Sequence, residues 1–284
     1  MPPADRGTLY LCATPIGNLE DITLRALRVL KEVDLIAAED TRRTRKLCSR
    51  YDIRTPLTSY HEHSPPSKAR RLLEDLRAGK SIALVADAGL PGISDPGHEL
   101  VVQAIQADVP VVVVPGPSVV TSALVVSGLP TRAFRFEGFL PRRRAERRPA
   151  LERLCRETET LVFFEAPHRL LHTLADMLEC LGDRRIAVVR ELTKVHEQVV
   201  RCSISEALAH FREHRPRGEF ALVVAGAEPA PEAEPDRAEV EAALSELLAQ
   251  GLSTRDAVRR VSELYGLPRR HVYAVAHGLR AGED

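Results

Sequence analysis

Short apolar runs alternate with amphipathic stretches along the first half of this sequence, and this alternation constrains the fold more than any other feature. The runs are apolar nearly throughout and are bounded by Gly, Pro or Asp, which is typical of buried strands. They predict strands at Thr8–Ala13, Leu35–Ala38, Ile82–Ala86 and Val109–Val114. The stretches between them predict helices at Asp21–Lys31, Thr41–Tyr51, Ser67–Ala78 and Gly97–Ala107. Strand and helix in repetition predict a parallel sheet with helices on its faces.

The second half has a different order of predicted strands and helices. Two strands are separated there only by Glu191–His196, which predicts an antiparallel hairpin and therefore a mixed sheet. The predicted strands are Phe134–Phe139, Leu161–Glu165, Arg185–Arg190, Glu197–Cys202 and Glu219–Val224. The predicted helices are Ser118–Ser127, Arg143–Arg156 and Ala166–Leu181.

An acidic segment rich in Pro and Ala, Ala227–Arg237, separates this region from the C-terminal part of the chain and predicts a linker. Three helical stretches follow it, with a tight turn at Gly266 and Leu267, and they resemble a helix-turn-helix module. They are Ala238–Ala249, Thr254–Tyr265 and Pro268–Leu279. A length of 284 residues suits two compact domains and a small third, which we expect at residues 1–117, 118–226 and 238–284.

Composition and charge restrict the partners of the chain. No apolar run reaches the length that crosses a bilayer, and the first residues lack the features of a signal peptide, so we expect a cytoplasmic protein without a membrane anchor. The 40 basic residues balance 40 acidic residues, so a nucleic acid must bind to a local patch. Five scattered cysteines, and a His61-Glu62-His63 sequence without further ligands, predict neither a disulfide framework nor a metal site.

The segment Pro141–Pro149 is the best candidate for a phosphate-binding patch. It carries five arginines against one glutamate and is bordered by prolines, which predicts a mobile surface loop or a frayed helix start. A charge run of this kind is usually a solvated face, and RNA binding is the functional alternative. The candidate RNA-binding residues are Arg142, Arg143, Arg144, Arg147 and Arg148.

Three turns follow strands of the predicted parallel sheet, at the edge where open α/β folds bind ligands. The first, Thr14–Asn18, has one glycine and resembles an ordinary turn, while Val85–Gly97 combines Gly, Pro, Asp87 and Asp95 at a density that favours a binding loop. Asp95 could instead be the N-cap of the next helix. Pro115–Ser118 forms either a helix cap or a second wall of the same pocket.

The second half contains two further polar segments at strand ends. In Phe163–Arg169, the side chains of Glu165 and Arg169 could simply pair with each other. Arg190–Glu197 has five ionisable side chains among eight residues, and the sequence favours a functional site and a solvated hairpin tip equally.

Six ordered motifs between Thr14 and Glu197 resemble those of the tetrapyrrole methylase family, and within it a group that methylates small-subunit ribosomal RNA. They are TPIGNLEDITLRAL, AAEDTRRTRKL, VADAGLPGISDPG, VVPGPS, FFEAPHRL and RELTKVHE. The resemblance implies a two-domain α/β fold, the class III methyltransferase fold, with S-adenosylmethionine in the cleft between the domains. It also implies methylation of the ribose 2'-hydroxyl of a cytidine in the decoding region of 16S rRNA, by a homodimer.

The same resemblance implies site residues. The cofactor pocket would be lined by Pro15, Gly17, Asp87, Leu90, Ile93, Ser94, Ser118, Val119, Ala166 and Ala225. Leu90 departs from the threonine that is usual in the group, which puts a hydroxyl contact there in doubt. On the substrate side, Glu191, Lys194 and Glu197 would face the RNA, and either Glu191 or Lys194 would assist deprotonation of the ribose hydroxyl.

Two alternatives remain at this point. A tetrapyrrole C-methyltransferase of the same fold would share the cofactor pocket and differ in its acceptor. A non-catalytic nucleic-acid-binding regulator would use the C-terminal helices and bind the cofactor without turnover. The sequence also leaves open whether the substrate is naked 16S rRNA or the assembled 30S subunit.

Overall fold

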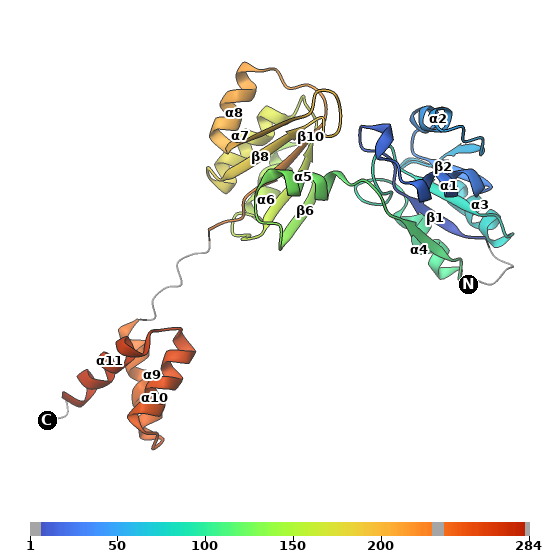
Figure 1. Cartoon of the computed structure of the whole chain (residues 1–284). Helices are drawn as coiled ribbons and strands as arrows, with labels where there is room; N and C mark the ends of the chain where they lie inside the picture. The colour runs from blue at the N-terminus through green and yellow to red at the C-terminus, as the bar shows by residue number, and fades with distance from the viewer. Residues whose placement is uncertain (1–6, 229–235, 282–284) are drawn as a thin grey trace. The chain divides into compact units, whose positions relative to one another are not determined.

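A computed structural model of the chain describes residues 7–228 and 236–281, and it divides into two compact units, Met1–Ala227 and Glu228–Asp284 (Figure 1). The first unit contains two five-stranded sheets, and we call the part around each sheet a lobe. Most of the predicted linker, residues 227–237, lies outside the described residues. The predicted boundary between residues 117 and 118 stays a prediction.

The sheet of the first lobe is parallel throughout, as predicted, with the strand order β3-β2-β4-β1-β5. Its strands are β1 (Leu9–Cys12), β2 (Leu35–Ala38), β3 (Leu57–Ser59), β4 (Ile82–Val85) and β5 (Val111–Val114). The sequence analysis missed β3. This edge strand has three residues, all at least partly accessible, and therefore lacks the apolar run that marks its neighbours.

Helices cover both faces of this sheet and enclose two apolar cores. α1 (Leu24–Glu32) and α2 (Thr41–Arg50) pack on one face, and α3 (Pro66–Arg77) and α4 (His98–Gln106) pack on the other. Side-chain caps fix two of the helix starts, because the Thr23 side chain accepts a hydrogen bond from the amide of Ala26 and Asp40 accepts one from Arg42. A short 3-10 turn, η1 (Leu19–Asp21), precedes α1.

The second lobe has the predicted mixed sheet, in the order β6-β7-β10-β8-β9. Its strands are β6 (Phe134–Phe139), β7 (Thr160–Glu165), β8 (Arg185–Arg190), β9 (Gln198–Ser203) and β10 (Phe220–Val224). β6 and β7 are parallel and the other pairs are antiparallel, so the predicted hairpin of β8 and β9 is confirmed.

One face of the second sheet carries three helices and the other face carries one. α6 (Arg144–Glu152), α7 (Leu170–Leu181) and α8 (Ile204–Glu213) surround the larger core, and α5 (Val119–Ser127) covers the opposite face. The sequence analysis missed α8. This helix begins directly after β9 with a capping box in which Ser203 and Glu206 satisfy each other's backbone amides.

The described part of the second unit contains the three predicted helices, α9 (Arg237–Ala249), α10 (Thr254–Tyr265) and α11 (Arg269–Ala281). They bury a small core of their own, formed by Val240, Leu244, Ala257, Val258, Val261, Val272 and Ala276. Gly266 ends α10 in the left-handed conformation and starts the turn toward α11. Over the described part of the chain, no helix combines the length and the hydropathy that a bilayer crossing requires.

Gly97→Ala is expected to destabilise the first unit by about 3 kcal/mol. An added Cβ would lie 2.7 Å from Cδ2 of the core residue Leu84, and the backbone has a φ of +133°. Gly128→Ala is the matched control, because Gly128 also has a positive φ but no atom within 4 Å of the added Cβ. The control should lose only about 1 kcal/mol. Urea unfolding measures both values, and equal losses would contradict the steric argument.

Candidate functional site

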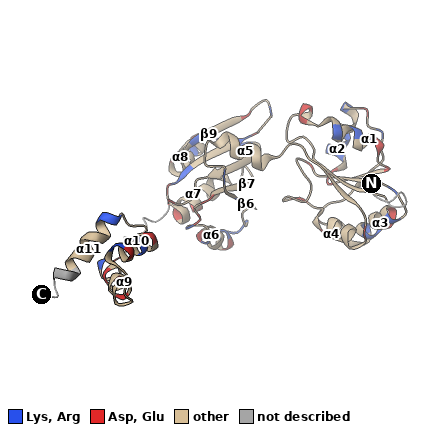
Figure 2. Ribbon diagram, turned by 60° about the horizontal axis from the view of Figure 1, so that its bottom comes forward, with Lys and Arg blue, Asp and Glu red and all other residues tan. Residues whose placement is uncertain are grey.

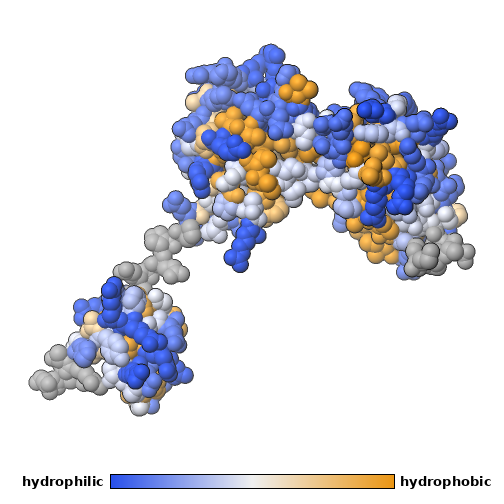
Figure 3. Space-filling view, viewed as in Figure 1, coloured by the Kyte–Doolittle hydropathy of each residue, from blue (hydrophilic) through white to orange (hydrophobic). Residues whose placement is uncertain are grey.

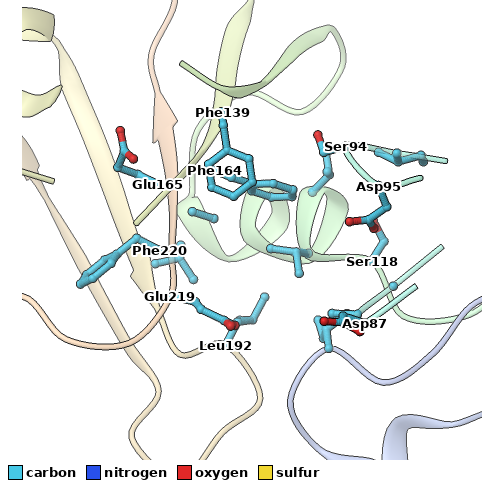
Figure 4. A pocket seen from close by; sticks show the side chains of 18 of the residues that line it. Asp87, Ser94, Asp95, Ser118, Phe139, Phe164, Glu165, Leu192, Glu219 and Phe220 are labelled. Atoms are coloured by element: carbon cyan, nitrogen blue, oxygen red, sulfur yellow. The ribbon is translucent and has the colours of Figure 1, made fainter. Parts of the chain in front are cut away.

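The two lobes enclose a cavity of about 310 Å³ between the carboxyl edge of the first sheet and one end of the second. Figure 4 shows Asp87, Ser94, Asp95 and Ser118 on one side, Leu192, Glu219 and Phe220 on the other, and Phe139 and Phe164 between them. The remaining lining residues include Ile16, Glu39, Arg43, Leu90, Ile93, Val119, Ala166 and Lys194. A second cavity of about 320 Å³ adjoins it and shares several of its walls.

Backbone contacts draw the turns of the first lobe together. The amides of Thr14 and Gly89 each donate to the other residue's carbonyl, at 2.9 and 3.0 Å, and the Thr14 hydroxyl donates to the carbonyl of Ala86 at 3.1 Å. The third turn approaches just as closely, because a Cβ on Gly116 would lie 3.0 Å from Cβ of Ala13. The three turns therefore form one continuous wall.

Carboxylates give this wall a negative character. The Glu39 carboxylate accepts a hydrogen bond from the Asp87 amide, and the Asp87 carboxylate accepts one from the Asp40 amide, both at 3.1 Å. Arg43 lies 3.4 Å from the other oxygen of Asp87. Burial is the main cause that raises the pKa of Glu39 and of Asp87. The cavity is thus built to favour a cation over an anion.

Asp95 differs from these neighbours. Among the described residues its half-buried carboxylate has no hydrogen-bond or ion-pair partner, and the N-cap of α4 is Gly97, so the capping role considered for Asp95 is wrong. Burial, together with the charges of Glu39 and Asp87, raises the pKa of Asp95 to about 7. Ser118 does occupy the N-cap position of α5, but its side chain makes no capping bond and remains available to a ligand.

The wall of the second lobe is aromatic. Phe164 on β7 meets Phe136 and Phe139 of β6 edge to face, with ring centroids 4.9 and 5.6 Å apart. Phe139 keeps 55% of its surface exposed, so the cleft offers an open aromatic ring. Glu165 instead points away from the cavity (Figure 4). It forms an ion pair with Arg169 at 3.2 Å, which is the pairing that the sequence analysis considered.

The loop between β8 and β9 closes the site against the first turn. The Thr193 hydroxyl accepts a hydrogen bond from the Asn18 amide at 3.1 Å, and a Cβ on Gly17 would lie 2.7 Å from the carbonyl oxygen of Leu192. Lys194 lines both cavities, and its ammonium donates to Glu191 and Glu219 at 2.9 Å each.

These contacts decide the charge states of Glu191 and Lys194. Burial alone would raise the pKa of Glu191, but hydrogen bonds from Lys194 and from the Glu219 amide outweigh it and lower the pKa. Burial alone would lower the pKa of Lys194, but the hydrogen bonds to Glu219 and Glu191 raise it. Lys194 is therefore held as a cation at neutral pH, and Glu191 as its carboxylate partner.

The structure brings most of the predicted cofactor residues together. The main cavity is lined by Asp87, Leu90, Ile93, Ser94, Ser118, Val119 and Ala166, and the adjoining cavity by Pro15 and Gly17. Ala225 lies in neither cavity. β10 runs antiparallel to β7 and β8, so its first residue, Phe220, is opposite Glu165 and Arg190 at the cleft, and Ala225 follows the far end of the strand.

The sequence analysis missed Glu39, Arg43, Phe139, Glu219 and Phe220 as lining residues. Glu39 directly follows β2, so the strand-end argument that selected Asp87 could have found it. Among the described residues, no group of three or more His, Cys, Asp or Glu side chains could hold a metal ion.

The predicted arginine patch is largely neutralised within the fold. Arg144–Glu152 is helix α6, so the predicted helix at Arg143–Arg156 is confirmed over most of its length, and the alternative of a mobile loop is wrong for these residues. Arg147 is only 4% exposed, and its guanidinium lies 2.6 Å from the buried carboxylate of Asp176. Arg144 pairs with Asp176 and Glu179, and Arg148 pairs with Glu179. Acidic residues of α7 therefore bind three of the five arginines.

Only the first two arginines of the patch remain largely free. Arg143 has a loose contact with Glu146, at 3.7 Å. Arg142 has no acidic partner within the described ranges, and both side chains belong to exposed residues. The available positive surface is thus smaller than the composition of Pro141–Pro149 suggested.

Comparisons with known proteins show which family models and relatives this chain is similar to. Residues 8–208 match the family model described as tetrapyrrole (corrin/porphyrin) methylases, and residues 234–280 match the RsmI C-terminal HTH domain. A relative from Halalkalibacterium halodurans, named ribosomal RNA small subunit methyltransferase I, is 48% identical over 96% of both chains. A relative of the same name from Thermotoga maritima is 50% identical over 222 residues, which cover all of that protein and 78% of this chain.

A solved structure has a similar fold. The uroporphyrin-III C-methyltransferase of Thermus thermophilus, complexed with S-adenyl homocysteine, has a TM-score of 0.55 at 24% identity. The match covers 76% of this chain and 97% of that one. At this identity the similarity concerns the fold.

Asp95→Asn is expected to stabilise the protein at alkaline pH and to leave it unchanged near pH 4. Asp95 has a pKa of about 7 in the folded state, against about 3.9 when unfolded. Its contribution to the free energy of unfolding is therefore complete below the unfolded pKa and is lost as the pH rises through the folded pKa. The gain at pH 8 should be about 1 kcal/mol, discounted for partial exposure. Urea unfolding over this pH range tests it, and a gain that does not change with pH would contradict it.

Proposed function

Because this chain belongs to the tetrapyrrole methylase family, we propose that it transfers a methyl group from S-adenosylmethionine to the RNA of the small ribosomal subunit. The proposed acceptor is the ribose 2'-hydroxyl of a cytidine in the decoding region. The observation that carries the proposal is the similarity to the relative from Halalkalibacterium halodurans, which extends over 96% of both chains and so includes both units. A cytoplasmic location is part of this proposal, because the proposed substrate is ribosomal RNA.

The cavity suits this cofactor. When bound, S-adenosylmethionine supplies an electrophilic methyl group on a positively charged sulfur. Glu39, Asp87 and Asp95 surround the space with negative charge, and negative charge favours a sulfonium over the neutral sulfide that remains after transfer. The Ser118 hydroxyl makes no capping hydrogen bond and can bind a ligand, and the aromatic ring of Phe139 provides a flat apolar surface. We propose that these residues, with Leu90, Ile93, Ser94, Val119 and Ala166, hold the cofactor.

Lys194 places a cation at the cavity, where it can assist the methyl transfer. Its ammonium is fixed by Glu191 and Glu219 at the boundary of the two cavities. A ribose oxygen that loses its proton gains negative charge, and a fixed cation lowers the free energy of that state. We therefore assign Lys194 the role of stabilising the oxygen and Glu191 the role of positioning Lys194.

Two surfaces are available for RNA. Arg142 and Arg143 are exposed residues next to the cleft-forming strand β6. In the second unit, Arg255, Arg259 and Arg260 of α10 are exposed, as are Arg269 and Arg270 at the start of α11 (Figure 2). Arginines in the first turn of a helix oppose the helix dipole, so a bound anion would stabilise Arg269 and Arg270 there.

Assembly as a homodimer is part of the proposal, and exposed apolar surface supports it. β5 is an edge strand of four valines, and edge strands of soluble monomers are normally short, charged or covered. Val113 on this strand is 50% exposed, and Ile105 on α4 is 60% exposed. Figure 3 shows hydrophobic side chains on the visible face of both lobes. A second copy of the chain would cover such surface.

Methyl transfer from tritiated S-adenosylmethionine tests the main proposal. The protein is offered small ribosomal subunits that lack the modification, their extracted RNA, or uroporphyrinogen. We expect label in the RNA, at a cytidine whose ribose resists alkaline cleavage. Label in the tetrapyrrole would support a C-methyltransferase, and bound cofactor without any transfer would support a regulator.

Lys194→Met is expected to lower the single-turnover rate on RNA about 100-fold, because it removes a fixed cation from the charged oxygen. The affinity for S-adenosylmethionine should change much less, since the cofactor is itself a cation. Lys80→Met is the control, because Lys80 pairs with Asp75 and lines neither cavity. Stopped reactions with labelled cofactor measure the rate. An unchanged rate would remove Lys194 from the reaction.

Replacing Arg142 and Arg143 by serine is expected to weaken RNA binding and to flatten its salt dependence. Each lost phosphate contact lowers the slope of log K against log salt by about 0.7 to 0.9. The double variant Arg259→Ser, Arg260→Ser tests the second unit in the same titration. Arg54→Ser is the control, since Arg54 pairs with Asp52 on an exposed loop. A slope equal to that of the wild type would exclude the changed pair from the interface.

A further inference from the structure

Asp95 is the carboxylate of the cleft that is free to accept a proton. Each of the other acidic side chains of the main cavity already binds a donor: Glu39 binds the Asp87 amide, Asp87 the Asp40 amide, Glu165 the Ala166 amide and Glu219 the Lys194 ammonium. Within the described ranges, Asp95 has no such donor. Its oxygens face the interior of the cavity, beside Ser118 in the view of Figure 4.

The backbone holds Asp95 at the junction of the lobes. Ser94, directly before it, has a φ of +59°, which is strained for a residue with a side chain, and Gly97 begins α4 with a φ of +133°. A Cβ on Gly138 of β6 would lie 2.9 Å from the Ser94 hydroxyl oxygen, so the loop contacts the second lobe at this point. Strained backbone of this kind persists where the surrounding structure fixes a functional side chain.

We propose that Asp95 is the proton acceptor of the methyl transfer. The inference rests on the proposed function and deepens it, because a ribose hydroxyl is a poor nucleophile until its proton leaves. In the step, the O–H bond of the 2'-hydroxyl breaks and the proton moves to an Asp95 oxygen. The ribose oxygen forms the new bond to the methyl carbon. The carbon–sulfur bond breaks, and its electron pair remains on sulfur as a neutral sulfide.

The charges that face Asp95 suit this role. Glu39 and Asp87 at the ends of β2 and β4 disfavour a third negative charge, while Arg43 on α2 and Lys194 on the β8–β9 loop are the cations of the cavity. Of the other acidic residues of the lining, Glu219 pairs with Lys194, and Glu165, whose side chain points away from the cavity (Figure 4), pairs with Arg169. A base is most effective when its pKa is close to the working pH, and Asp95 has a pKa of about 7.

The arrangement divides the work between two residues. Lys194 is held protonated by Glu191 and Glu219, so it can stabilise the ribose oxygen but cannot take its proton. Glu191 has a lowered pKa and is already bound by Lys194 and the Glu219 amide, so it is a weaker base than Asp95. Deprotonation is therefore assigned to a side chain that neither the motif nor the resemblance had singled out for it.

Single-turnover methylation of small ribosomal subunits between pH 5.5 and 9 tests the inference. In the wild type, the rate should rise tenfold for each pH unit and level off near or below pH 7. Asp95→Asn should lower the rate at pH 7.5 by about 10²- to 10⁴-fold and should show no plateau. Its affinity for S-adenosylmethionine, measured by calorimetry, should stay within about tenfold of the wild type, as expected for the loss of one partly screened charge.

Asp95→Glu and Asp52→Asn are the matched variants. Asp95→Glu keeps a carboxylate and should recover at least about tenfold of the lost rate, which a misfolded loop would not allow. Asp52 is an exposed carboxylate of the same lobe, and its variant should behave as the wild type. In spectra of protein labelled with ¹³C at the aspartate carboxyls, one signal should titrate near pH 7 in the free wild type and be absent from Asp95→Asn.

Three results would overturn the inference. An active wild type together with an equally fast Asp95→Asn would refute it and leave the proposed function intact. A rate loss that disappears at saturating cofactor would make Asp95 a binding residue. If the wild type binds S-adenosylmethionine but methylates no RNA, the proposed function fails and the inference fails with it.

Discussion

The common direction of the strands in the first sheet is the constraint from which the site follows. Because β1, β4 and β5 are parallel neighbours, the turns after them emerge at one edge. The reciprocal bonds between Thr14 and Gly89 then continue the pairing beyond the strands and fix the first turn to the glycine-rich loop. An antiparallel strand at either position would carry its turn to the opposite edge and leave the cleft without a wall.

Much of this arrangement could be predicted from the sequence, because buried parallel strands and amphipathic helices leave strong local patterns. The errors have identifiable physical causes. β3 has only three residues, all partly accessible, and therefore leaves no apolar run. α8 begins directly after β9, and its buried residues Ile204, Ala207, Leu208 and Phe211 do have helical spacing, so this signal was present in the sequence and was missed. The bulge in β6 between Phe136 and Gly138 changes which face the next residue occupies, so alternation along the strand does not place Phe139 beside Phe164.

Ionisable residues are the part that local patterns predict least well. Five arginines between two prolines suggest a free basic patch, but α7 lies beside α6 and its acids neutralise three of them. The opposite happens at Asp95, which resembles a helix cap in the sequence. Gly97 is the N-cap of α4 instead, and Asp95 has no partner among the residues that the structure describes. Whether a charge is satisfied depends on partners distant in sequence, and only the folded chain brings those partners together.

Although the net charge of the chain is zero, the structure has a negative cavity and separate positive surface. A cationic cofactor requires a negative cavity, whereas a polyanionic substrate requires positive surface, and one uniform field would repel one of the two. The fold separates them, with carboxylates inside the cleft and exposed arginines outside it. The relative from Thermotoga maritima matches over 222 residues, close to the length of the first unit alone. The second unit has an apolar core of its own and carries exposed arginines on α10 and α11.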